Sequence, residues 1–210
     1  MDLSFNQLRK PLNFALQIKD FLIHRKAIKS FVHAAFAIED TWVDSGSVKE
    51  VEYPLLKELC QKAGEFDGPI VEIGTLFGFA TTKLALWKKP QQKIITVDNY
   101  CWNPIGLPPR AHLQLTTRVL EYLRQTGQVE LLNIDKSKFF RDFKLRPAMV
   151  FLDADHSYEE TKKDILWALG AKAPIISGHD YSDLCPGVKK AVDEFGGPDQ
   201  LLGSVWTLKA

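Results

Sequence analysis

From residue 68 onwards the chain alternates short apolar runs with longer stretches whose apolar residues recur at helical spacing. Apolar runs typical of buried strands occupy residues 69–74, 93–98, 128–134, 148–153, 173–177 and 204–209. Helical spacing occupies residues 80–88, 111–125, 157–169 and 187–195. Short apolar strands separated by helices are typical of βαβ units, in which helices cover both faces of a sheet. The pattern therefore predicts an α/β fold with a doubly wound, mostly parallel sheet.

The first 46 residues follow a different pattern, with aromatic-rich amphipathic stretches and no strand-like alternation. Apolar residues recur there at helical spacing, among them Phe14, Ile18 and Phe21. We expect residues 1–46 to form an N-terminal helical extension that covers a core, a substrate or a partner subunit, and a homo-oligomer fits this expectation. A membrane-surface helix is the alternative. Residues 47–210 would form the main domain, which opens with a helix up to Gly64.

Composition narrows the possible partners. The 210 residues are 45% hydrophobic and 25% charged, as in ordinary globular proteins, and the net charge of +1 lacks the basic excess of nucleic-acid binders. The three cysteines are too few and too scattered for a disulfide framework. No apolar run approaches the ~20 residues that span a bilayer, and no signal-peptide pattern opens the chain. We therefore expect a cytoplasmic protein without membrane insertion or a nucleic-acid partner.

The loop after the first predicted strand contains Glu72, Gly74, Thr75 and Gly78. The two glycines allow a tight turn and the close approach of a ligand. Thr75 stands where the G-x-G-x-x-G pattern has its second glycine, so the loop is poorly suited to the diphosphate of a nicotinamide dinucleotide. A carboxylate at Glu72 can attract a cationic ligand or brace the loop, and the pattern leaves both interpretations open.

Two further acids follow strands. Asp98 ends the second predicted strand, where a carboxylate can accept hydrogen bonds from both hydroxyls of a ribose. Asp135 follows the third strand, at a position that lies near the base in nucleoside-binding sheets. The alternative for Asp98 is a helix or turn cap, and the alternative for Asp135 is a structural turn.

The fourth and fifth predicted strands end in ionisable residues. Asp153, Asp155 and His156 follow the fourth strand, and His179 and Asp180 follow the fifth. Charged groups at the ends of buried strands are costly unless they have a function. Carboxylates and imidazoles that converge at one sheet edge suit a divalent metal, or a general base held by an acid. A purely structural role, with Asp155 as a helix cap, is the alternative.

These segments together resemble the class I S-adenosylmethionine-dependent methyltransferases, a Rossmann-like family. The narrower resemblance is to small-molecule O-methyltransferases such as those that act on macrolide sugars. It rests on VEIGTLFGFATTKLA (71–85), ITVDNY (95–100), FLDADHSYEETKKDI (151–165) and SGHDYSDLCPGVKKAVDEF (177–195), and covers about residues 45–209.

The resemblance implies a role for each site residue. The methionine part of the donor would lie against Glu72, Gly74, Thr75 and Gly78, with Asp98 on its ribose and Asp135 beside its adenine. Asp153, which belongs to the same donor site, would with His179 and Asp180 hold a divalent metal, magnesium or manganese. His156 would serve as the base, with Asp155 as the neighbouring acid. The acceptor would be a hydroxyl of a small molecule.

Some metal-dependent relatives have an acid where this chain has His179, and an imidazole favours manganese or zinc over magnesium. The proline-rich segment 99–110 resembles a lid, and Trp102, Tyr158 and Tyr181 are candidates for the acceptor wall. Two alternatives to a methyltransferase remain. One is a catalytically silent methyltransferase-like domain that binds a nucleoside or a protein, and the other is a nicotinamide-dependent oxidoreductase, which Thr75 argues against.

Overall fold

The computed structural model describes residues 47–209, and the predicted extension over residues 1–46 lies outside them. The helical segments are η2 (Glu50–Glu52), α2 (Tyr53–Ala63), α3 (Phe79–Trp87), α4 (Pro109–Val119), α5 (Glu121–Gln125), α6 (Lys136–Asp142), α7 (Tyr158–Gly170) and α8 (Pro186–Glu194). The strands are β1 (Ile70–Ile73), β2 (Ile94–Asp98), β3 (Val129–Asn133), β4 (Met149–Leu152), β5 (Ile176–Gly178), β6 (Gln200–Leu202) and β7 (Val205–Leu208).

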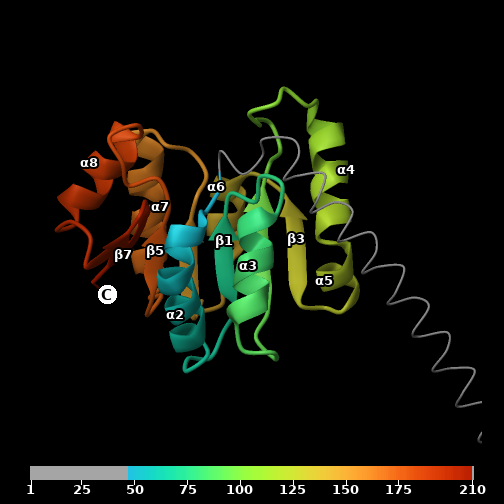
Figure 1. Cartoon of the computed structure of the whole chain (residues 1–210), viewed down its shortest axis with the longest axis horizontal. Helices are drawn as coiled ribbons and strands as arrows, with labels where there is room; N and C mark the ends of the chain where they lie inside the picture. Colours follow the sequence, from blue (N-terminus) through green and yellow to red (C-terminus); the bar gives the residue numbers. More distant parts are fainter. Residues whose placement is uncertain (1–46, 210) are drawn as a thin grey trace, which may run out of the picture.

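The strands form one seven-stranded sheet in the order β3-β2-β1-β4-β5-β7-β6 (Figure 1). The first five strands are parallel, and β7 and β6 add an antiparallel edge. This confirms the predicted doubly wound, mostly parallel sheet. The strand order reverses between β1 and β4, which makes the carboxyl ends of these two strands the expected ligand-binding edge.

Three local features differ from the sequence pattern. The helix expected over residues 111–125 divides at Leu120 into α4 and α5. The short helix α6 was not predicted, because its first residues are polar and it has no apolar repeat of useful length. The three-residue strand β6 was missed because it lies among glycine and proline residues.

Two apolar cores sandwich the sheet, since successive residues of a strand point to opposite faces. On β1, Ile70 packs with α2 and α3, whereas Val71 packs with the side chains of α6, α7 and α8. Four of the parallel strands, β1, β2, β4 and β5, are buried along nearly their whole length, as expected for a sheet covered on both sides.

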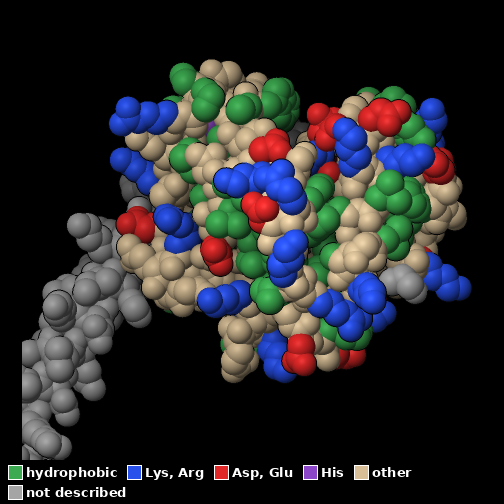
Figure 2. Space-filling model, turned by 180° about the vertical axis from the view of Figure 1, so that it is seen from behind, with side chains coloured by type: hydrophobic (Ala, Val, Ile, Leu, Met, Phe, Trp, Pro, Cys, Tyr) green, Lys and Arg blue, Asp and Glu red, His purple; other side chains and the backbone are tan. Residues whose placement is uncertain are grey.

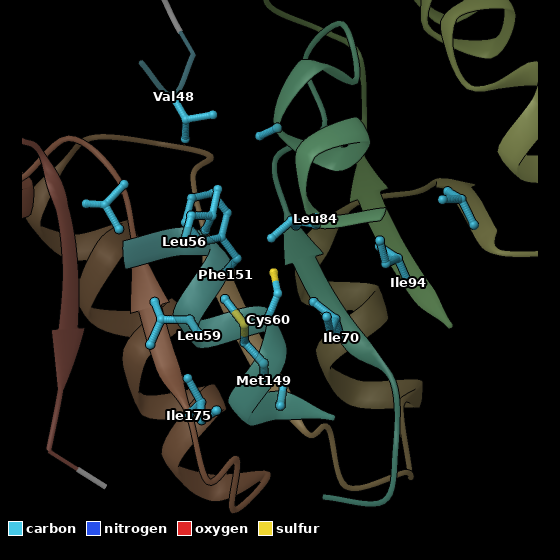
Figure 3. Packing of buried hydrophobic residues seen from close by; sticks show 14 of the residues in the cluster. Val48, Leu56, Leu59, Cys60, Ile70, Leu84, Ile94, Met149, Phe151 and Ile175 are labelled. Carbon is cyan, nitrogen blue, oxygen red and sulfur yellow. The ribbon is translucent and has the colours of Figure 1, made fainter. Parts of the chain in front are cut away.

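Helix α2 and the residues before it are anchored in the first of these cores. Figure 3 shows Leu56, Leu59 and Cys60 of α2 directed towards β4, near Met149 and Phe151. Pro54 stands in the first turn of α2, where its missing N–H costs nothing. This packing fixes the start of α2, and with it the residue Glu52, close to the carboxyl end of β5.

The surface carries mixed charge. On the face turned away from the viewer of Figure 1, lysine and arginine side chains are interspersed with acidic ones (Figure 2). Among residues 47–209, no helix is long and apolar enough to cross a lipid bilayer.

Candidate functional site

A cavity of about 490 Å³ opens at the carboxyl ends of β1 to β4. This volume lies within the range of pockets that enclose small organic ligands. Apolar residues and a few acids line it together: Ile73, Gly74, Leu76, Val97, Asp98, Asn99, Cys101, Trp102, Ile134, Asp135, Lys136, Asp153, Ala154, Asp155, His156 and Glu160. Gly74, Asp98, Asp135, Asp153, Asp155 and His156, all predicted from the sequence, are therefore gathered around one cavity.

The loop between β1 and α3 is held by Asp98. Oδ2 of Asp98 accepts hydrogen bonds from the backbone N–H groups of Thr75 and Leu76, both at 2.9 Å. Its Oδ1 accepts a third from the N–H of Tyr100 at 2.7 Å. Asp98 thus fixes the loop on one side of the cavity and presents its carboxylate to the cavity on the other.

Gly74 is required by the close approach of two strands. Its φ is +98°, and a Cβ at this position would lie 2.1 Å from the carbonyl oxygen of Asp153. A side chain would therefore push the loop away from the end of β4. Gly78 also has positive φ, at +85°, where it precedes α3. Thr75 and Gly78 belong to the same loop, but neither of them lines the cavity.

Glu72 lies beneath this loop and does not line the cavity. Its carboxyl group is fully buried, and its Oε2 accepts hydrogen bonds from the hydroxyls of Thr81 and Thr96, both at 2.5 Å. Burial raises the pKa of Glu72 to about 8, although the two hydroxyls oppose the rise. The contacts match the bracing interpretation of Glu72, because they connect β1, β2 and α3 below the loop.

Asp135 caps a helix at the cavity wall. Its Oδ1 accepts hydrogen bonds from the N–H groups of Ser137 at 2.9 Å and Lys138 at 3.3 Å, which makes it the N-cap of α6. Beside it, Lys136 contacts Asp164 on α7, with an N–O distance of 2.8 Å. Asp135 therefore has a structural role as a helix cap, and the same residue also lines the cavity.

Beside the cavity, the ends of β4 and β5 bring two acids and two histidines together. Nε2 of His156 lies 2.9 Å from Oδ2 of Asp180. Nδ1 of His179 lies 3.5 Å from the same Asp180 oxygen and 3.6 Å from Oδ1 of Asp153. Asp180 has a φ of +61°, a conformation that is uncommon for a residue with a side chain and that is enriched at functional sites.

The acid that contacts His156 is Asp180, on the neighbouring strand. Asp155, the acid that the sequence analysis paired with His156, instead accepts a hydrogen bond from the N–H of Ser157 at 2.7 Å. These contacts with Ser157 lower the pKa of Asp155. The hydrogen bond to Asp180 raises the pKa of His156, against the effect of burial. Nδ1 of His156 faces the Cys185 thiol at 3.7 Å.

A buried carboxylate that the sequence analysis missed completes the cluster. Glu52 is 1% exposed, and its Oε2 lies 3.1 Å from Nε2 of His179, 127 residues further along the chain. Burial by itself would raise the pKa of Glu52, but hydrogen bonds from His179 and two backbone groups lower it to about 2. Nothing in the local sequence around Glu52 marks this contact.

The charges within this cluster are strongly coupled. Burial alone would lower the pKa of His179, but the carboxylates of Asp153, Asp180 and Glu52 raise it to about 12. Burial would raise the pKa of Asp180, yet contacts with the two histidines hold it well below its usual range. Asp153 differs, because burial raises its pKa despite the neighbouring imidazoles. The cluster thus pairs carboxylates with two imidazoles beside the cavity.

The donor set of Asp153, His179 and Asp180 fits a divalent metal. Their ligand atoms all lie within 4.8 Å of one another. Nδ1 of His179 is buried and has no hydrogen-bond partner among the described residues, although it faces both carboxylates. A buried nitrogen between two carboxylate oxygens is suited to ligate a cation.

The aromatic candidates for the acceptor wall lie in different places. Trp102 lines the cavity and is 67% exposed, on the loop between β2 and α4. This loop rises above the sheet at the cavity end of the strands (Figure 1). Tyr158 and Tyr181 instead contact acids of α8, Glu194 and Asp193, and do not line the cavity.

Comparison with known proteins agrees with this geometry. Residues 71–181, more than half of the chain, match the family model described as a methyltransferase domain. A search of curated protein sequences gave no match. The chain therefore belongs to the methyltransferase-domain family.

Solved structures share the fold. An O-methyltransferase from Bacillus cereus, in complex with SAH, has a TM-score of 0.60 at 17% identity, over 80% of this chain and 79% of that one. TomG, an O-methyltransferase from Streptomyces achromogenes involved in tomaymycin synthesis, has a TM-score of 0.59 at 18% identity, over 86% of this chain and 90% of that one. CalS11, a TDP-rhamnose 3′-O-methyltransferase of calicheamicin biosynthesis, has a TM-score of 0.54 at 15% identity, over 91% of this chain and 94% of that one. At these identities the likeness concerns the fold.

Proposed function

We propose that this protein transfers the methyl group of S-adenosylmethionine to a hydroxyl oxygen of a small molecule. The observation that carries the proposal is the position of His156 and Asp153, which line the same cavity as Asp98 and Asp135. A donor bound at Asp98 would thus share one enclosed space with a base and a carboxylate cluster. Three of the solved structures that share the fold are O-methyltransferases, which supports an oxygen acceptor.

The donor would be held by the loop after β1 and by the two acids that follow β2 and β3. Asp98 would accept hydrogen bonds from the ribose hydroxyls, while it continues to fix the N–H groups of Thr75 and Leu76. Asp135 would lie beside the adenine. Gly74 would allow close approach of the methionine part, because it has no side chain at the point where the loop meets the end of β4.

His156 would remove the acceptor proton. Because Asp180 contacts Nε2, the proton of the acceptor hydroxyl would go to Nδ1, whose 3.7 Å contact with Cys185 is weak. As the hydroxyl oxygen attacks, the new O–C bond forms, the S–C bond breaks, and its electrons return the sulfonium to a neutral thioether. General-base catalysis of this kind contributes about 10²–10⁴-fold, and alignment of donor and acceptor contributes further.

A divalent cation would be held by Asp153, Nδ1 of His179 and Asp180. When bound there, it would lower the pKa of the acceptor hydroxyl and offset the negative charge of the acids. Of these three residues, Asp153 lines the cavity.

The small size of the cavity and the mixed charge of the surface favour a small-molecule acceptor over a nucleic acid. Trp102 would cover the acceptor from the β2–α4 loop. The extension over residues 1–46 remains a proposed substrate cover or subunit contact, and a cytoplasmic location remains a proposal based on the cysteine content.

Calorimetric titration with S-adenosylmethionine, S-adenosylhomocysteine and NAD tests the donor site. We expect micromolar binding of the two adenosyl ligands and none of NAD. Asp98→Asn should weaken donor binding about tenfold or more, since hydrogen bonds to a charged group contribute more than neutral ones. Asp67→Asn, an exposed acid in the turn before β1, is the matched control and should bind as the wild type does. Absence of binding by both adenosyl ligands would overturn the proposal.

Screening of hydroxylated small molecules with donor labelled in the methyl group then tests the acceptor. Transfer of label to an oxygen atom is expected, and transfer only to nitrogen atoms would contradict the proposed acceptor class.

A further inference from the structure

We infer that Glu52 is a positioning residue which turns His179 into a fixed nitrogen ligand, so that this site prefers manganese or zinc to magnesium. The inference rests on the metal site proposed above. It concerns residues of this chain that lie outside the segment matched by the family model, Glu52 before it and Ser204 after it.

The carboxylate of Glu52 is fully engaged. Oε2 accepts hydrogen bonds from the N–H of Lys49 at 2.6 Å and from Nε2 of His179 at 3.1 Å. Oε1 accepts them from the N–H and hydroxyl of Ser204, at 2.7 and 2.8 Å. Four donors around a buried carboxylate hold it in one position and satisfy it in the absence of water.

The surroundings leave room for this arrangement. Gly203 has a φ of +62°, and a Cβ there would lie 2.5 Å from Cγ of Glu52 and 2.6 Å from Oε1. On the other side, the indole N–H of Trp206 donates to the carbonyl oxygen of His179 at 2.9 Å. The imidazole is therefore fixed both through its side chain and through its backbone.

These contacts assign the two ring nitrogens. Nε2 faces the Glu52 carboxylate, which can only accept a hydrogen bond, so Nε2 carries a proton. The hydroxyl of Ser204 lies 2.9 Å from the same nitrogen. Nδ1 is left facing the carboxylates of Asp153 and Asp180. A ligating histidine commonly has this arrangement, with its second nitrogen bonded to a carboxylate that fixes the ring.

The distances at Nδ1 suit a shared ion. The separations of 3.5 and 3.6 Å from the two carboxylate oxygens exceed the usual N–H···O range. Ligand bonds of about 2.0–2.2 Å place neighbouring ligand atoms about 3.0–3.6 Å apart. One nitrogen with two carboxylate oxygens is a donor set for manganese or zinc, whereas magnesium prefers oxygen ligands alone.

Calorimetric titration of the full chain with Mn²⁺, Zn²⁺ and Mg²⁺ tests the inference. The wild type should bind Mn²⁺ or Zn²⁺ at least ten times more tightly than Mg²⁺. Glu52→Gln should reduce that affinity by about 10–100-fold, the usual effect of removing a residue that orients a metal ligand. Glu50→Gln is the matched control, because Glu50 is an exposed acid of the same short helix η2.

A second variant separates positioning from folding. The double substitution Glu52→Gln with His179→Glu supplies an oxygen ligand in place of the imidazole, so it should shift the preference towards Mg²⁺. Thermal unfolding of each variant shows whether it is folded. Glu52→Asp keeps the charge on a shorter side chain. It should bind more tightly than Glu52→Gln, and if Glu52→Gln does not fold, Glu52→Asp replaces it and should bind Mn²⁺ or Zn²⁺ less tightly than the wild type.

Spin-echo resonance of bound Mn²⁺ provides a readout that a purely structural role would not move. It should detect nitrogen from His179 in the wild type, and the double variant should lose this signal. The inference is overturned if the wild type binds none of the three ions, if it prefers Mg²⁺, or if Glu52→Gln binds as tightly as the wild type. Titration with S-adenosylmethionine distinguishes failure of this inference from failure of the proposed function. If the protein binds the donor but no metal, the inference is wrong and the proposed methyl transfer still stands.

Discussion

Replacement of Glu72 by glutamine should remove one large source of pH dependence from the stability of this protein. Glu72 is fully buried, and its Oε2 accepts hydrogen bonds from Thr81 and Thr96. Its pKa rises from 4.5 to about 8 because burial disfavours the charged carboxylate. Glutamine has nearly the same shape but does not titrate, so the substitution removes the charge with little change in packing.

The sign of the effect follows from proton binding. Between about pH 4.5 and pH 8 the folded protein retains the Glu72 proton, whereas the unfolded chain releases it. The free energy of unfolding therefore falls as the pH rises through this window. The difference between pKa values of 4.5 and about 8 corresponds to about 5 kcal/mol, at about 1.4 kcal/mol per pKa unit. The unfolding free energy of Glu72→Gln should not show this decrease, so the difference between the two proteins should shift in favour of Glu72→Gln as the pH rises.

Urea unfolding at a series of pH values, with two-state analysis, provides the measurement. The quantity to follow is the difference in unfolding free energy between wild type and Glu72→Gln, because groups that titrate in both proteins cancel. Glu65→Gln, an exposed acid after α2, is the control and should follow the wild-type curve. Parallel curves for wild type and Glu72→Gln from acid to alkali would refute the reasoning, since they would mean that folding does not shift the pKa of Glu72.

Three further substitutions test other parts of the site. His156→Ala should lower turnover about 10²–10⁴-fold with unchanged donor affinity, measured by label transfer and calorimetry, and unchanged turnover would remove His156 as the base. Gly74→Ala should lower the unfolding free energy by about 3 kcal/mol or more, because the new Cβ would clash with the Asp153 carbonyl oxygen. Gly127 also has positive φ but no atom near its Cβ position, so Gly127→Ala should lower the unfolding free energy by only about 1–2 kcal/mol. Lys136→Met should destabilise by about 3–5 kcal/mol by leaving Asp164 buried without its cation, against at most about 1 kcal/mol for the exposed Lys163→Met. Equal losses within either pair of denaturation curves would contradict the explanation for that pair.

The sheet could be predicted because each strand has a distinct apolar run, and parallel strands buried on both faces need one. The acids of the cavity could also be anticipated. Asp98 ends β2, Asp135 and Asp153 follow β3 and β4, and parallel strands end at the same edge of the sheet. These residues lie close together because the strands are parallel, and the hydrophobic pattern already predicts a parallel sheet.

What could not be predicted depends on contacts between distant segments. The pairing of His156 with Asp180 instead of Asp155 depends on how β4 and β5 lie side by side. Glu52 is further from prediction, because its partners His179 and Ser204 are 127 and 152 residues away. A glutamate before a helix is common in any sequence, and only the packing of α2 against β4 and the turn at Gly203 reveal its role.

The bonds of Glu52 also decide how the chain can be divided. The segment matched by the family model, residues 71–181, contains Asp153, His179 and Asp180 but excludes both Glu52 and Ser204. A fragment cut at those limits would retain Asp153, His156, His179 and Asp180, yet Nε2 of His179 would lose both of its partners, Glu52 and Ser204. A design that transfers this site to another protein must therefore include residues 49–52 and the turn at 203–204. If only the strand ends were transferred, His179 would lack the hydrogen bonds that fix its ring.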